Sequence, residues 1–257
     1  MSIFERDGSL FLPTDAARGP WDPNFLHGGP VAMLAAHAIE SLPSESDMRV
    51  ARLTLELVRP VPVAPLQVSA EITRPGRKVR LVAVSIEAGG QQVTRAVALQ
   101  VRRGDLPDLP VNEPSQPPPG PAGLKSWGEG WAGEGAYYHS QGVELLPQPG
   151  ADPRRPKQVW IRLRTDPVAG EPATPLQRIL AAADFPNGVS LRADPRRFLS
   201  INPELTVHVQ REPAGEWVAL DAETYLERDG SGLAEGVLYD ERGRLGRTAQ
   251  SLIVELR

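Results

Sequence analysis

The sequence of 257 residues contains no cysteine, which excludes disulfides, thiolate nucleophiles and cysteine-ligated metals or clusters. It has only four histidines, which argues against a histidine-rich metal site, so we expect no metal and no redox cofactor. No apolar run approaches the roughly 18 residues of a membrane-spanning helix. The first residues show no basic start followed by an apolar stretch, so no secretory signal is visible and we expect a cytoplasmic protein.

Positive charge is not in excess either. Lysine and arginine number 28 against 32 aspartates and glutamates, which gives a formal net charge of −4. A protein that binds nucleic acid needs a basic face, and this balance does not indicate one. Hydrophobic residues make up 40% of the chain, so it can bury a core and fold as a globular protein. We therefore expect neither nucleic acid nor a membrane span among its partners.

Proline, in contrast, is abundant: there are 27, and seven of them fall between residues 104 and 125. Such a segment cannot form a helix or a central strand, because proline has no backbone N–H and a fixed φ angle. It predicts an extended, semi-rigid linker. We expect this linker to divide the chain into two domains, residues 1–103 and 126–257.

The two halves repeat one order of elements. A proline near the first turn opens an apolar helix in each half, at Pro30 and at Pro175. Alternating apolar and polar residues then predict strands, with hairpin turns at Gly89-Gly90 and Arg242-Gly243. The predicted strands are residues 52–59, 79–87 and 92–103 in the first half, and 205–210, 217–227, 232–240 and 247–256 in the second.

The halves also match at a fixed offset of 152 positions. This offset joins Thr54 to Thr206, Arg59 to Arg211 and Arg95 to Arg247. Three matches at one offset indicate an internal duplication. A helix with an apolar stripe has to bury that stripe against its sheet. The arrangement looks like a tandem hotdog protein, an α+β fold in which each half is an antiparallel sheet wrapped around one central helix.

Polar side chains and glycines gather directly before the first predicted helix, at Asn24, His27, Gly28 and Gly29. The first N–H groups of a helix have no partner within the helix and carry partial positive charge. They can stabilise the oxyanion that forms when a thioester carbonyl is attacked, and glycine lets a substrate approach closely. His27-Gly28-Gly29 resembles the start of this helix in hotdog-fold acyl-CoA thioesterases. The resemblance implies that these residues and Asn24 contact the substrate.

The second half resembles the acyl-CoA thioesterase II family in three short pieces. They are Ala183-Asp184-Phe185 at the end of the second helix, Ser200-Ile201-Asn202-Pro203 before a strand, and Thr248-Ala249-Gln250 in the last strand. Double-hotdog members of that family hold a water with an Asp, a Thr or Ser, and a Gln. The resemblance implies an acyl-CoA thioesterase whose catalytic residues are Asp184, Ser200 and Gln250. The family's usual aromatic and histidine run after the hydroxyl residue is missing, which leaves Thr206 as the alternative hydroxyl.

General chemistry favours the same residues. Without cysteine, metal or a serine elbow, hydrolysis of a thioester requires an activated water, with a carboxylate as base and neutral groups to orient it. Asp184 follows the apolar stretch 179–183, where burial suits a base. Gln250 corresponds to Ala98 at the offset of 152, as expected if only one of two duplicated sites kept its chemistry.

Two other functions stay open. Asp22, Asn24 and His27 resemble the Asp-x-Asn-Pro-x-His stretch of hotdog enoyl-CoA hydratases, which act with an Asp and His pair, although Phe25 replaces the proline. The second alternative is a non-catalytic acyl-CoA binding protein on the same fold, because a fold does not fix a function.

Two further expectations concern nucleotides and assembly. Residues 128–133 spell G-x-G-x-x-G, but they follow the linker rather than a strand, so they do not predict a dinucleotide site. Sheet edges and exposed faces favour closed symmetric assembly, so we expect a homodimer or a larger homo-oligomer.

Overall fold

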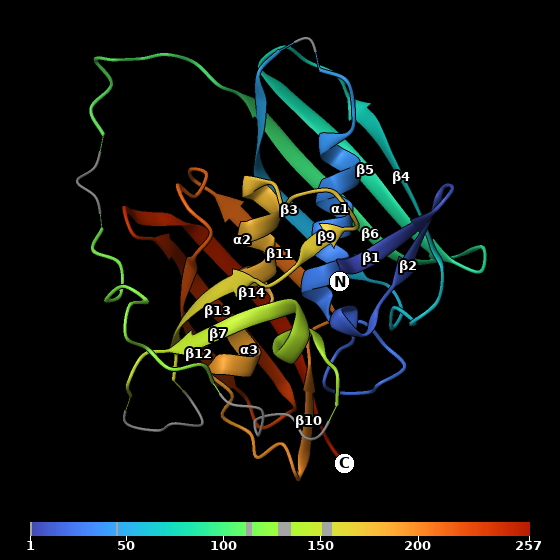
Figure 1. Cartoon of the computed structure of the whole chain (residues 1–257), viewed down its shortest axis with the longest axis vertical. Coiled ribbons are helices and arrows are strands. Elements are labelled where there is room, and N and C mark those ends of the chain that lie inside the picture. The colour runs from blue at the N-terminus through green and yellow to red at the C-terminus, as the bar shows by residue number, and fades with distance from the viewer. Residues whose placement is uncertain (1, 45, 112–114, 128–134, 151–155) are drawn as a thin grey trace.

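The computed structural model describes all residues except 1, 45, 112–114, 128–134 and 151–155. Its strands form one curved sheet around two neighbouring helices, α1 and α2 (Figure 1). The first half contributes β1 (Ser2–Asp7), β2 (Leu10–Pro13), α1 (Gly28–Glu40), β3 (Met48–Leu57), β4 (Leu66–Arg74), β5 (Val79–Ala88) and β6 (Gln91–Arg102). The second half contributes β7 (Val143–Pro147), β8 (Gln158–Leu163), β9 (Asp166–Val168), α2 (Pro175–Ala183), α3 (Pro186–Val189), β10 (Phe198–Ile201), β11 (Glu204–Val209), β12 (Val218–Leu226), β13 (Ser231–Asp240) and β14 (Gly243–Leu256).

Both central helices have clear start signals in the sequence. The side chain of His27 caps the N-terminus of α1, and Thr174 caps α2 by accepting a hydrogen bond from the Gln177 N–H. Residues 28–36 of α1 are all buried, which is expected of a helix that is apolar on every side. The helices pack against each other in opposite directions, so the start of α1 lies at the end of α2.

The centre of the sheet joins the two halves. The strand order is β7-β8-β12-β13-β14-β11-β3-β6-β5-β4-β2-β1-β9, with β10 paired to β14. In the central antiparallel pair Thr206 lies directly opposite Thr54, and their hydroxyl oxygens are 3.4 Å apart. Arg95 and Arg247 occupy equivalent places in β6 and β14, opposite β3 and β11. A local two-fold axis therefore passes between the two threonines, and the duplication at an offset of 152 is confirmed.

Several strands were not predicted from the sequence. They are β1, β2, β4, β7, β8, β9 and β10. In β4 only Leu66 is fully buried, although Leu66, Val68, Ala70 and Ile72 alternate with polar residues as in a half-buried strand. β1 pairs in parallel with β9, Ser2 lying opposite Asp166, so the N-terminal strand belongs to the edge of the second half as well as to its own half.

The described residues of the proline-rich segment form neither helix nor strand, as predicted. The segment runs around the outside of the molecule from β6 to β7 (Figure 1). The carbonyl of Pro119 accepts hydrogen bonds from the Trp160 indole, at 2.6 Å, and from the Gln148 amide. The G-x-G-x-x-G segment lies outside the described residues. In the part of the chain that is described, no helix is long and apolar enough to span a membrane.

Candidate active site

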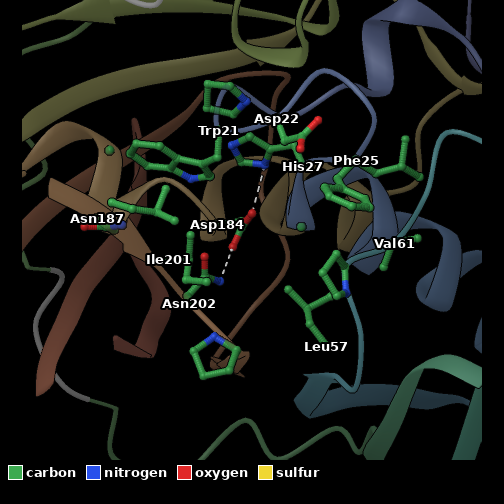
Figure 2. A pocket seen from close by; sticks show the side chains of 18 of the residues that line it. Trp21, Asp22, Phe25, His27, Leu57, Val61, Asp184, Asn187, Ile201 and Asn202 are labelled. Carbon is green, nitrogen blue, oxygen red and sulfur yellow. Dashed lines mark hydrogen bonds and ion pairs between the residues drawn. The ribbon is translucent and has the colours of Figure 1, made fainter. Parts of the chain in front are cut away.

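The start of α1 and the end of α2 meet at a single carboxylate. Asp184 is the residue that ends α2, and Figure 2 shows it between His27 and Asn202. Close approach of the two helices requires glycine at position 28. A Cβ atom there would lie 2.6 Å from Asp184 Oδ2, which is shorter than any ordinary contact. Gly28 therefore brings the positive end of the α1 dipole against the carboxylate.

Three side chains surround the Asp184 carboxylate: two donate hydrogen bonds to it, and the third is the His27 imidazole. Gln250 Nε2 donates to Oδ1 at 2.6 Å, and Asn202 Nδ2 donates to the same oxygen at 2.9 Å. His27 Nδ1 lies 2.8 Å from Oδ2. Only 3% of the Asp184 side chain and 11% of the His27 side chain are exposed. The carboxylate is therefore fixed in direction by groups from both halves of the chain.

His27 Nδ1 faces two partners that require different protonation states. It lies 3.1 Å from the Gly29 N–H, from which it can accept only when it carries no proton. It can donate to Asp184 Oδ2 only when it does carry one. His27 Nδ1 can therefore make only one of these two hydrogen bonds at a time. His27 is also one of the residues that line a cavity.

A second layer of buried polar groups holds Gln250. Its Oε1 accepts the Asn187 N–H at 3.3 Å, and the Asn187 side chain in turn accepts from the Ser200 hydroxyl at 3.2 Å. Ser200 is 1% exposed and is not among the residues that line the cavity. Of the predicted catalytic residues, Gln250 thus contacts Asp184 directly, whereas Ser200 reaches it only through Asn187 and Gln250.

The cavity beside Asp184 has a volume of about 420 Å³ and a mostly apolar wall. Phe25 and Val61 lie on one side of it, and Trp21 lies on the other side with Ile201 of β10 (Figure 2). Its polar end is formed by His27, Gly28, Asp184 and Asn202. An apolar pocket with a few convergent polar groups is the usual form of a small-molecule site.

Aromatic rings pack behind the His27 imidazole. The ring centroids of Tyr138 and Phe185 each lie 4.9 Å from that of His27. The Tyr138 hydroxyl donates to the Ala181 carbonyl at 3.0 Å. Burial, followed by the nearby negative charge of Asp184, raises the pKa of Tyr138 well above its usual value. Tyr138 therefore stays neutral and keeps the imidazole in place.

Two residues singled out in the sequence lie away from this cavity. Asn24 is exposed and does not line the cavity; its carbonyl accepts the Val63 N–H, at 2.9 Å. Thr206 lies on the opposite face of β11 from Leu205 and Val207, beside the central axis of the sheet. Thr206 thus does not replace Ser200 as a hydroxyl near Asp184.

Asn187 and Asn202 are functional candidates that were not singled out from the sequence. Asn187 lies in the short helix α3 and Asn202 between β10 and β11, and only their contacts distinguish them from other asparagines. Among the described residues no group of three or more His, Asp or Glu side chains could hold a metal ion.

The fold and the site together define a double-hotdog protein with a carboxylate and histidine pair between its halves. Residues 17–101 match the family model described as the acyl-CoA thioesterase N-terminal domain, and residues 108–254 match the one for the C-terminal domain. The chain belongs to the acyl-CoA thioesterase family. No curated protein sequence matches it.

Solved structures with a similar fold extend over nearly the whole chain. A protein from Thermobifida fusca provisionally assigned as a thioesterase II is 18% identical, with a TM-score of 0.71, covering 99% of this chain and 95% of that one. A conserved hot dog fold protein from Alicyclobacillus acidocaldarius is 19% identical, with a TM-score of 0.69 and the same coverage. The acyl-CoA thioesterase II TesB2 from Mycobacterium marinum is 16% identical, with a TM-score of 0.64, covering 98% and 94%. At these identities the likeness concerns the fold, and it confirms the predicted tandem hotdog.

Proposed function

We propose that this chain hydrolyses acyl-CoA thioesters to a free acid and CoA. The observation that supports this most is the Asp184 carboxylate, which is buried at the polar end of an apolar cavity and is held by His27, Asn202 and Gln250. The apolar wall suits an acyl chain, and the thioester carbonyl would then lie beside Asp184 and the start of α1. Membership of the acyl-CoA thioesterase family supports the same substrate class.

In the proposed reaction a water attacks the thioester carbonyl carbon and gives its proton to the Asp184–His27 pair. His27 Nε2 accepts this proton, and the proton on Nδ1 passes to Asp184 Oδ2. His27 Nδ1 can then accept the Gly29 N–H, its second contact. The pair returns the proton to the sulfur as the carbon–sulfur bond breaks. Water is thus consumed, and one acid and one thiol are formed.

The remaining predicted residues would assist these steps. The Gly28 amide, in the first turn of α1 and in the wall of the cavity beside Asp184, would donate to the developing oxyanion. Gln250 and Ser200 would act as positioning residues, because Gln250 donates to Asp184 and Ser200 supports Gln250 through Asn187. Their removal should therefore misdirect the carboxylate rather than remove the base.

Enoyl-CoA hydratase activity is the second candidate, because an acid and histidine pair also suits the proton transfers of hydration. The pair differs from the one expected from the sequence. His27 contacts Asp184 of the second half, whereas Asp22 Oδ1 accepts the Asn24 N–H at 2.8 Å. The resemblance to the hydratase stretch therefore does not extend to the contact between its acid and its histidine.

The experiment that tests the proposal is a panel of acyl-CoAs with a thiol-release assay, run beside an assay for loss of the enoyl absorbance of an enoyl-CoA. We expect release of CoA from at least one saturated acyl-CoA. Loss of enoyl absorbance without thiol release would establish the hydratase instead. Binding of acyl-CoA with neither reaction would establish a binding protein.

A further inference from the structure

A second cavity lies at the opposite end of the helix pair from Asp184. It has a volume of about 250 Å³, and it is lined by the end of α1, with Ile39, and by the start of α2, with Leu176. The cavity beside Asp184 is lined instead by the start of α1 and by the residue that ends α2. The two cavities therefore occupy the two ends of one antiparallel pair of helices.

The local two-fold axis of the sheet relates the two cavities. Arg49 of β3 lines the second cavity and Ile201 of β10 lines the first, and these residues are 152 positions apart. Arg49 pairs with Val101 of β6, and Ile201 pairs with Ile253 of β14, which again lies 152 positions further on. The same offset relates two more pairs of lining residues, Leu57 with Val209 and Asp47 with Leu199. The second cavity is thus the duplicated counterpart of the candidate active site.

This counterpart lacks the groups that the first cavity offers for catalysis. When the helices are aligned at Pro30 and Pro175, Ile39 takes the place of Asp184, and the match of Gln250 is an alanine. Two of the matched wall positions, which are apolar in the first cavity, are charged here. The wall therefore suits a small polar ligand rather than an acyl chain.

A buried arginine forms part of this wall. Arg80 of β5 is only 7% exposed, and Gln100 of β6 lies directly opposite it. Arg80 Nε donates to Gln100 Oε1 at 2.6 Å, and its Nη1 donates to the Pro43 carbonyl at 3.0 Å. Both acceptors are uncharged. Burial of a guanidinium without an anion is costly, so this cation is a candidate for binding a ligand.

A second guanidinium of the wall, that of Arg49, also has a neutral partner. Its Nη1 donates to the Val209 carbonyl at 3.0 Å. Within the described part of the chain, neither Arg49 nor Arg80 forms an ion pair. Two cations thus line one cavity without a counter-ion from a described residue.

The acidic residues of the same wall have other partners. Arg103 Nε lies 3.3 Å from Asp47 Oδ1, and the Arg103 guanidinium also pairs with Glu212. Glu40 Oε2 accepts a hydrogen bond from the Thr174 hydroxyl at 2.9 Å. None of these carboxylates therefore neutralises the other two arginines of the wall.

We infer that this second cavity binds a small oxyanion, with Arg49 and Arg80 as its cationic partners. Guanidinium suits carboxylate and phosphate because it offers paired donors in a planar fork. The volume of about 250 Å³ lies below the roughly 300–1,000 Å³ that is usual for ligand pockets, so the ligand has to be small. The duplicated chain would then carry one cavity for the reaction and one for an anion.

The test is calorimetric titration of the whole chain with two probes, inorganic phosphate and succinate, which separate a phosphate from a carboxylate ligand. We expect at least one of them to bind with a Kd of about 1 mM or below. Arg49→Gln and Arg80→Gln should each weaken that binding about tenfold or more, because hydrogen bonds to a charged group are lost. The bound probe should also raise the melting temperature of the wild type.

The matched control is Arg77→Gln, which removes an exposed arginine between β4 and β5 that lines neither cavity and should keep wild-type affinity. If melting curves show that Arg80→Gln does not fold, Arg49→Gln decides the test, because Arg49 is only half-buried. The inference is overturned if the wild type binds neither probe, or if the folded variants bind as tightly as this control. These measurements do not depend on thioester hydrolysis, so their failure and the failure of the proposed function are distinguishable.

Discussion

Replacing Gly28 by alanine should disable the site while leaving the fold intact. A Cβ atom at position 28 would lie 2.6 Å from Oδ2, 2.9 Å from Cγ and 3.0 Å from Oδ1 of Asp184, whereas ordinary contacts begin at 3.4 Å. The carboxylate would have to move by about 0.8 Å, and a misplacement of about 1 Å in a catalytic group costs on the order of 10²-fold in rate. We expect kcat for CoA release to fall by about that factor.

The same substitution should not destabilise the protein by much. Gly28 has a helical backbone without positive φ, and alanine is favoured over glycine in a helix by about 0.5–1 kcal/mol. This gain opposes the cost of moving Asp184, so the melting temperature should change by only a few degrees. Circular dichroism melts would be recorded on the preparations used for the thiol-release assay.

Gly29→Ala is the control for this experiment. Its Cβ atom would lie 3.1 Å from a ring carbon of Tyr138, which needs to give only a few tenths of an ångström, and it would not press on Asp184. We expect less than a tenfold loss of kcat. Near wild-type kcat for Gly28→Ala, or a loss that follows a collapse in melting temperature, would refute the reasoning that Gly28 sets the position of the carboxylate.

Three other substitutions test the surroundings of the site and the fold. Gln250→Ala removes a hydrogen bond to a charged group, so kcat should fall by about 10- to 100-fold in the thiol-release assay; an unchanged kcat would exclude a positioning role. Burial lowers the pKa of His139 from 6.5 to about 4 in the folded protein. Between pH 6.5 and pH 4 the unfolded chain therefore binds a proton on His139 that the folded chain does not bind. The free energy of unfolding should fall as the pH is lowered through this range. Urea unfolding at pH 7 and pH 4.5 measures this change, and the free energy of unfolding should fall less between the two pH values for His139→Gln than for wild type. Equal falls in the two proteins would contradict the prediction. Arg211→Ala leaves the buried Asp240 carboxylate without its cation. It should lower the free energy of unfolding by about 2–4 kcal/mol and leave kcat unchanged. A loss below about 0.5 kcal/mol, which is typical of a surface substitution, would show that the ion pair does not stabilise the fold.

Local signals were enough to predict much of the fold. The helix after Gly29 begins next to a proline and is apolar throughout, and β3 and β11 alternate in the way a half-buried strand requires. The offset of 152 followed from a few matched residues, and the pairing of Thr54 with Thr206 gives it a physical meaning. β4 was missed although Leu66, Val68, Ala70 and Ile72 alternate with polar residues, so the signal for this strand was present in the sequence.

The site was predictable only in part, because its contacts join residues that are distant in sequence. Asp184 and Gln250 were selected together, and the structure places them in direct contact, while their catalytic roles stay predictions. The contact of His27 with Asp184 joins the two halves, and no local pattern indicates such a pairing. Ser200 was selected for its hydroxyl, but only the hydrogen bonds of Asn187 in α3 show that Asn187 stands between it and Gln250.

The most direct test of the central claim is the rate of CoA release by wild type and by Asp184→Asn, measured under single-turnover conditions on the best acyl-CoA of the panel. Asparagine keeps the size of the side chain but cannot take a proton, and loss of a general base costs on the order of 10² to 10⁴ in rate. We predict a loss of that size for Asp184→Asn, with its melting temperature close to that of wild type, and a comparable loss for His27→Gln. Wild-type turnover by Asp184→Asn would contradict the account, because the carboxylate at the meeting point of α1 and α2 would then have no part in the chemistry.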